Sequence, residues 1–97
     1  MLHLLAQASL SDEVMLRVAA GDDVLLQGSA VWAAFRGHAD NPKVLHLLGL
    51  TCRIYALQDW LTVNGIALDQ LLTGVEAIDY GELVVLTEQN PVIATWC

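Results

Sequence analysis

Short apolar runs alternate with segments of helical periodicity along the chain. The apolar runs occupy residues 1–6, 22–27, 52–57, 75–79 and 92–96, and each has the length of a strand. Between the first two runs, Leu10, Val14 and Val18 recur at helical spacing. No hairpin-type turn joins consecutive runs, so crossover connections are expected. The pattern predicts an α/β fold: a three-layer sandwich with helices flanking a largely parallel sheet of about five strands.

Two of the expected helices carry end signals. Ser29 and Gly37 bound a predicted helix over residues 29–37. Asp79 and Glu82 form a D-x-x-E capping pattern, which predicts a helix over residues 80–89.

The last segment, NPVIATWC, predicts a strand at the edge of the sheet. Pro91 cannot donate a hydrogen bond to a β-ladder, which suits the start of an edge or terminal strand. Trp96 is a large side chain that we expect to anchor this strand by burial. Cys97 then lies beyond the strand without an anchor.

Composition changes this picture by pointing to subunit contacts. A chain of 97 residues has room for a single domain, which we expect to span residues 1–97. Hydrophobic residues make up 56% of the sequence and the mean hydropathy is +0.52, more than a small monomer easily hides. We therefore expect part of the apolar surface to lie in interfaces. Three tryptophans fall within apolar segments and are expected to pack there rather than stack on a ligand: Trp32, Trp60 and Trp96.

The formal net charge of −7 argues against direct binding of nucleic acid. Eleven acidic residues face four basic ones, which are scattered along the chain: Arg17, Arg36, Lys43 and Arg53. The acidic pairs Asp12-Glu13 and Asp22-Asp23 are interpreted as solvated groups at a helix start and a turn rather than as catalytic carboxylates.

The location expected from the sequence is a reducing cytoplasm. No apolar stretch reaches the about 20 uncharged residues that a membrane helix needs. The start, MLHLLAQASL, lacks the basic region of a signal peptide. Two cysteines are too few for a disulfide framework.

Known motifs for cofactors and metals are missing from the sequence. There is no G-x-G-x-x-G, no G-x-x-x-x-G-K-[ST] and no G-x-S-x-G, so no cofactor is expected. His3, His38 and His46 do not repeat at a ligand spacing and there is no C-x-x-C, so no metal site is expected.

The two thiols, Cys52 and Cys97, are the remaining candidates for chemistry. Cys52 opens an apolar run, where a free cysteine usually behaves as a small buried hydrophobe. Cys97 is terminal, but no basic residue near it in the sequence would stabilise a thiolate. We assign no catalytic residue, and Cys97 is a weak candidate only.

Several stretches are similar to a known family in order and spacing. MLHLL, GDDVLLQ, AVWAAFRG, IYAL and above all IDYGELVVLTEQNPVIATWC resemble the TusB/DsrH family along nearly the whole chain. The resemblance implies the DsrE/DsrF/DsrH-like α/β fold, in agreement with the alternation of strands and helices.

The resemblance also implies a non-catalytic subunit of a sulfurtransferase complex. TusB, TusC and TusD form a hexamer of two heterotrimers that takes persulfide sulfur from TusA. The complex passes this sulfur towards TusE and the enzyme that makes 2-thiouridine at the tRNA wobble position. The related DsrE, DsrF and DsrH proteins of sulfur oxidation work with DsrC. In both cases the transfer cysteine belongs to the TusD or DsrE partner.

Two positions depart from the family pattern. DsrH-type chains can carry a cysteine in the first helix, where Met15 stands here. Because a thioether cannot form a persulfide, this favours a TusB-like role over sulfur oxidation. Relatives have an acidic residue and a D-G pair at the positions of Gly28, Ser29 and Ala30. The resemblance therefore does not predict which contact this loop makes.

Other functions remain as alternatives to the non-catalytic subunit. One is a DsrEFH-type subunit in sulfur oxidation. Another is a direct persulfide carrier that uses Cys97 or Cys52. A third is a homo-oligomeric module that binds a small molecule.

Overall fold

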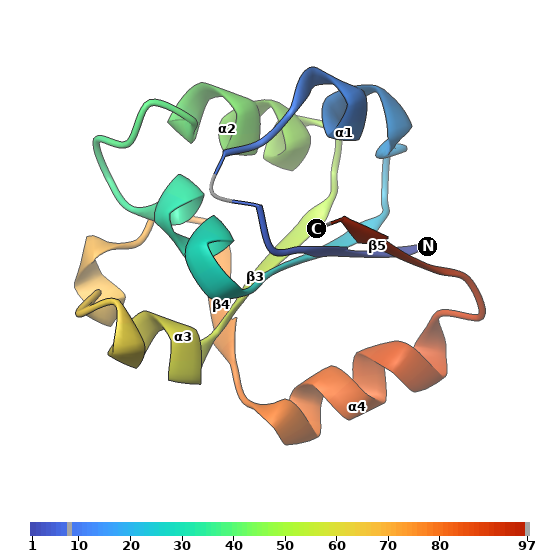
Figure 1. Cartoon of the computed structure of the whole chain (residues 1–97). Helices are drawn as coiled ribbons and strands as arrows, with labels where there is room; N and C mark the ends of the chain where they lie inside the picture. The colour runs from blue at the N-terminus through green and yellow to red at the C-terminus, as the bar shows by residue number, and fades with distance from the viewer. Residues whose placement is uncertain (8, 97) are drawn as a thin grey trace.

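The chain folds around a single parallel β-sheet (Figure 1). The computed structural model describes residues 1–7 and 9–96. The strands are β1 (Leu2–Leu5), β2 (Asp23–Leu26), β3 (Arg53–Leu57), β4 (Val75–Ile78) and β5 (Ile93–Trp96). Their order in the sheet is β4-β3-β2-β1-β5, and every neighbouring pair is parallel. This confirms the α/β class and the sheet of five strands.

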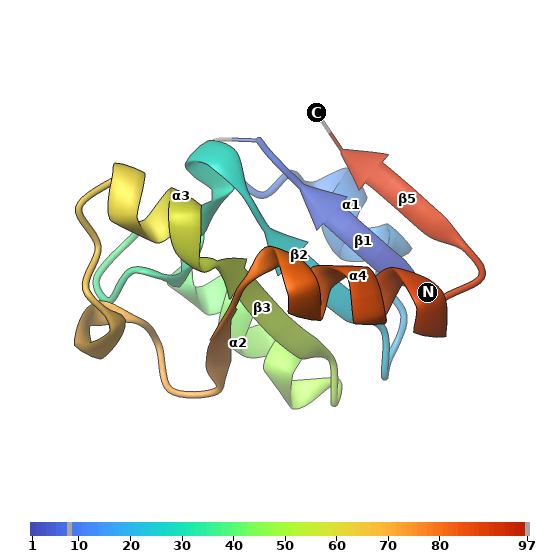
Figure 2. The same cartoon turned by 90° about the horizontal axis from the view of Figure 1, so that it is seen from below.

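Helices cover both faces of the sheet. They are α1 (Asp12–Arg17), α2 (Asn41–Gly49), α3 (Gln58–Val63) and α4 (Tyr80–Gln89), with short 3-10 helices η1 (Gly28–Ala34) and η2 (Leu68–Gln70). Figure 1 shows α1 and α2 above the sheet and α4 below it, and Figure 2 shows the lower side, where α4 runs across the strands. The three-layer arrangement is the one expected from the alternation of strands and helices.

The two faces of the sheet are covered unequally. Because side chains alternate along a strand, His3 and Leu5 point to one face and Leu2 and Leu4 to the other. The upper face, under α1, η1 and α2, holds the larger core cluster. The lower face holds a small cluster made of Leu2, Leu25, Leu57, Ile78 and Leu86. A single helix therefore supplies most of the cover on the lower face.

The helix expected over residues 29–37 is instead η1, a 3-10 helix that ends at Ala34. It begins after Gln27 without a side-chain cap, so Ser29 does not play the predicted role. Gly28 has a φ of +55° and lies against the backbone of Ala6. The segment is buried on more than one side, through Ala30, Val31, Ala33 and Ala34. A narrower helix suits this close packing, which the sequence pattern did not reveal.

Helix α4 is held at both ends. As predicted, Asp79 caps it: Oδ1 of Asp79 accepts a hydrogen bond from the Glu82 N–H at 2.8 Å. At the other end, the buried Asn90 donates to the Leu86 carbonyl at 2.8 Å and to Oδ2 of Asp23 at 3.0 Å. These contacts fix the position of α4 over the lower face of the sheet.

Strand β5 is an edge strand, as Pro91 predicted, because it pairs with β1 alone. Trp96 differs from the expectation, since it is half-buried rather than buried. Its indole packs on the upper face, and Nε1 donates to Nδ1 of His3 at 3.2 Å. The strand is thus anchored by a hydrogen bond as well as by burial.

Candidate interaction site

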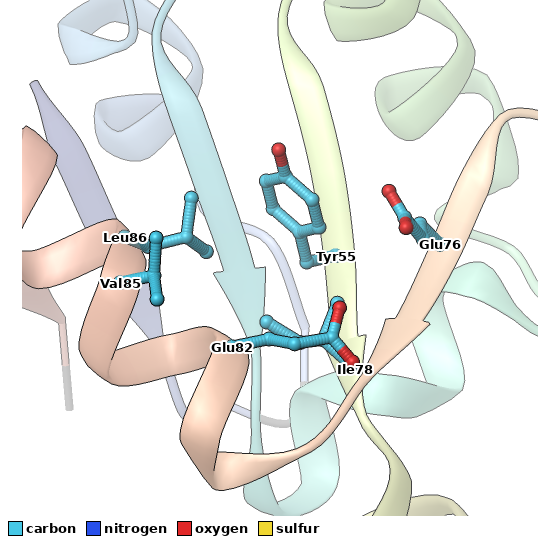
Figure 3. Close-up of a pocket in the computed structure, with 6 residues that line it drawn as sticks. All are labelled: Tyr55, Glu76, Ile78, Glu82, Val85 and Leu86. Atoms are coloured by element: carbon cyan, nitrogen blue, oxygen red, sulfur yellow. The ribbon is translucent and has the colours of Figure 1, made fainter.

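A groove of about 240 Å³ lies on the lower face between α4 and the strands β3 and β4. Its lining comes from these three elements: Tyr55, Glu76, Ile78, Glu82, Val85 and Leu86 (Figure 3). Small-molecule sites usually measure about 300–1,000 Å³. The groove is smaller than that, which suits a single side chain better than a cofactor.

Two sequence periodicities place the lining residues together. On the strands, Tyr55 and Glu76 are partners in register, and Ile78 follows on the same face two positions later. On α4, Glu82, Val85 and Leu86 have the i, i+3, i+4 spacing of one helix face. The buried Ile78 and Leu86 form an apolar floor, while Glu76 and Glu82 are exposed at the rim.

Tyr55 lies between the groove and two charged residues, Asp23 at the start of β2 and Arg53 at the start of β3. Burial raises the pKa of Tyr55, the negative charge of Asp23 raises it further, and Arg53 acts in the opposite sense. Figure 3 shows the Tyr55 hydroxyl pointing towards the beginning of β3. The phenol is therefore neutral at physiological pH and presents an aromatic ring to the groove.

Asp23 is a polar side chain that is nearly buried, with 8% of its surface exposed. Oδ2 accepts the hydrogen bond from Asn90, but Oδ1 is buried without a hydrogen-bond partner among the described residues. An unsatisfied carboxylate oxygen is costly in a folded protein. Asp23 thus places a carboxylate group on the lower face, beside the opposing charge of Arg53.

Helix α4 also carries exposed hydrophobic side chains, and of the three named next Val85 lines the groove. Tyr80, Val84 and Val85 are 53%, 54% and 49% exposed. We call these three residues together with the groove the α4 surface. The edge residue Ile93 is also exposed, on the same face of the sheet as the groove. Such apolar exposure is typical of surfaces that contact another protein.

A second depression of about 290 Å³ lies between α3 and η2. It is lined by Gln58, Leu61, Thr62, Ile66, Ala67 and Leu68. Leu68 in this lining is 65% exposed, and Val63 on α3 is 73% exposed. The expected surplus of apolar surface is therefore distributed over at least two regions of the molecule.

The described residues include one of the two thiols that the sequence singled out for chemistry. Cys52 is 5% exposed and its Sγ–H donates to the Ala19 carbonyl at 3.3 Å. Burial raises the pKa of Cys52, which keeps it a thiol. Met15 is half-buried on α1, against the upper core. Cys97 lies outside the described residues, so the prediction about its thiol stays a prediction.

The histidines also lie apart. His3 is buried on β1, His38 precedes α2 and accepts the Asp40 N–H, and His46 is exposed on α2. Within residues 1–7 and 9–96, no three His, Cys, Asp or Glu side chains are placed to hold a metal ion. None of the helices in this part of the chain is long and apolar enough to cross a membrane.

The sequence did not predict a partly buried hydrogen-bond network towards the β5 edge of the sheet. Nε2 of His3 lies 2.9 Å from Oδ2 of Asp22, which also accepts the Ala19 N–H at 3.0 Å. Because the indole of Trp96 can only donate, Nδ1 of His3 is the acceptor and Nε2 carries the proton. The network therefore joins the edge strand β5 to β1 and to the turn before β2.

The environment of Asp22 favours its charged form. Burial by itself raises the pKa of Asp22, but the hydrogen bonds from Ala19 and His3 and the N-terminal ammonium outweigh this effect. The pKa of Asp22 is consequently lower than its ordinary value. Asp22 is thus a structural acceptor and Asp23 is nearly buried, so neither is the solvated turn residue that the sequence indicated.

Comparison with known proteins identifies the fold and the family. The ychN protein from E. coli shares the fold with a TM-score of 0.79 and 16% identity, over 98% of this chain and 97% of that one. MTH1491, a protein of unknown function from Methanobacterium thermoautotrophicum, shares it with a TM-score of 0.74 and 19% identity, over 98% and 96%. None of the curated proteins matches the sequence. The DsrH-like protein family matches residues 6–92, and the chain therefore belongs to this family.

Proposed function

We propose that this protein is a non-catalytic subunit of a TusBCD-like sulfurtransferase complex in the cytoplasm. In this role residues 1–97 form one domain that assembles with TusC- and TusD-like chains into a heterohexamer. The complex relays persulfide sulfur from a TusA-like donor towards a TusE-like acceptor, for 2-thiolation of the tRNA wobble uridine. This chain positions its partners, and the TusD-like partner supplies the transfer cysteine.

The observation that carries the proposal is membership of the DsrH-like family in a chain that buries Cys52. A persulfide carrier needs an accessible thiolate, which the environment of Cys52 disfavours. Met15 on α1 adds no thiol at the position where DsrH-type chains can have one. The exposed residues of the α4 surface support a role in subunit contacts.

Two other functions agree with the family or with a particular residue. Membership of the DsrH-like family also agrees with a DsrEFH-type subunit in sulfur oxidation, with DsrE- and DsrF-like partners. A direct persulfide carrier would use Cys97. Cys52 cannot take this role because it is buried.

Reconstitution separates these functions. The chain is purified with its TusC- and TusD-like partners and supplied with a cysteine desulfurase and a TusA-like protein, and each subunit is weighed by mass spectrometry. We expect the added sulfur on the TusD-like chain alone and 2-thiouridine in tRNA when the complete system is present. A stable persulfide on this chain would refute the non-catalytic role. Sulfur transfer to a DsrC-like protein without tRNA thiolation would favour the sulfur-oxidation role.

A further inference from the structure

The rim of the groove carries two acidic side chains that form no ion pair with the described residues. In the part of the chain that the structure describes, the ion pairs involve Asp22 and Asp12 but neither Glu76 nor Glu82. Figure 3 shows Glu82 reaching from α4 towards the strand that carries Glu76. Two carboxylates from different elements thus flank one small groove.

The floor between these carboxylates is apolar. Ile78 and Leu86 are buried, and Val85 forms the wall on α4. The ring of Tyr55 completes the lining (Figure 3). A long side chain with an aliphatic stem and a cationic end fits such a lining, because the stem contacts apolar atoms while the charge stays at the polar rim. An aromatic ring adds attraction for a cation.

The charges around the groove also favour a cationic side chain as its occupant. Asp23, with one unpartnered buried oxygen, lies on the same face and acts electrostatically on Tyr55. Arg53 is the basic residue that opposes it there. The whole chain has a net charge of −7, so a second copy would meet this surface with like charge. A basic partner is therefore favoured over self-association at this groove.

We propose that the groove receives a lysine or arginine side chain from a partner subunit, presented on a segment that contacts the exposed Val85 beside it. The cationic end lies between the carboxylates of Glu76 and Glu82, and its stem contacts the apolar floor. This inference rests on the proposed function, because it names the chemistry with which the partner binds.

The test measures the affinity of this chain for its purified TusC- and TusD-like partners. The double variant Glu76→Gln/Glu82→Gln is compared with the matched control Glu13→Gln/Glu88→Gln. The control also removes two exposed acids, from α1 and from the end of α4, but neither of them lines the groove. Binding is measured at about 50 mM and about 300 mM salt, because salt screens exposed charge pairs. Thermal unfolding verifies that each variant is folded.

We expect the groove variant to bind about tenfold more weakly at low salt and to lose most of its salt dependence, whereas the control stays within about twofold of the wild type. Equal binding by both variants would overturn the inference and leave the proposed function standing. Failure of the wild type to bind these partners would instead refute the proposed function. A groove variant that changes only self-association would show that a second copy occupies the groove, which also overturns the inference.

Discussion

Replacing Trp96 tests whether the edge strand β5 is held by the hydrogen-bond network around His3. In the structure, Trp96 is half-buried and donates to His3, which is 0% exposed. Trp96→Phe keeps most of the ring contact but removes the donor to Nδ1 of His3. A buried acceptor without its partner costs about 1–3 kcal/mol. We expect the free energy of unfolding to fall by about 1 kcal/mol, at the low end of this range, since a distance of 3.2 Å is long for a hydrogen bond.

Trp96→Ala removes the ring as well. Truncation of a fully buried aromatic costs about 3–5 kcal/mol, so a half-buried indole accounts for roughly 2 kcal/mol. Together with the lost hydrogen bond, the total is about 3 kcal/mol. The magnitude follows from partial burial plus one hydrogen bond.

Urea denaturation of the dilute chain, followed by circular dichroism, measures both variants. The matched control is Trp60→Phe, because Trp60 is 37% exposed on α3 and lies outside the network. We expect this control to lie within about 0.5 kcal/mol of the wild type. If Trp96→Phe were as stable as the wild type, the hydrogen bond to His3 would not anchor β5 and the reasoning would be wrong.

Four further predictions address charge, thiol chemistry and association. The pKa of Asp22 is lowered in the folded state, so its charge stabilises the fold at pH values above the ordinary aspartate pKa of about 4. This contribution to stability is lost as the pH falls through the lower pKa of the folded state. Asp22→Asn should therefore destabilise the protein at pH about 7 and differ less from the wild type near pH about 3 in urea titrations; a difference independent of pH would contradict this. Cys97→Ser should leave assembly and tRNA thiolation nearly unchanged in the reconstituted complex, and loss of relay in a normally assembled complex would show a working thiol. The isolated chain should self-associate in sedimentation experiments and form a defined complex with its partners. A stable monomer at high concentration that does not bind these partners would argue against the exposed apolar surfaces as interfaces. The chain alone, with a net charge of −7, should not bind tRNA at physiological salt in a filter-binding assay; micromolar binding that weakens with salt would refute this.

Local features of the fold could be read from the sequence because they depend on residues close together in the chain. The apolar runs have strand length, and the absence of hairpin turns between them implies parallel neighbours. Asp79 was identified as a cap because its side chain needs only the Glu82 N–H three residues later. Pro91 indicated an edge strand because it has no N–H to donate to a neighbouring strand.

The 3-10 helix and the network around His3 depend on distant residues. η1 depends on the positive φ of Gly28, on its contact with Ala6 and on the burial of the alanines of η1. The hydrogen bond between Trp96 and His3 spans 93 positions, so no local pattern could reveal it. Burial of Cys52 was expected from its place before an apolar run, whereas its bond to Ala19 depends on the turn before β2.

The sequence by itself determined the class of fold, the number of strands, the family resemblance and the excess of apolar surface, since periodicity and composition are properties of the chain alone. Only the tertiary structure decided where that surface lies. Tyr55, Glu76 and Glu82 are unremarkable in their own segments, and they line one groove because β3 and β4 pair in register and α4 crosses the same face. The groove remains open because one helix is too narrow to cover the lower face of a sheet of five strands.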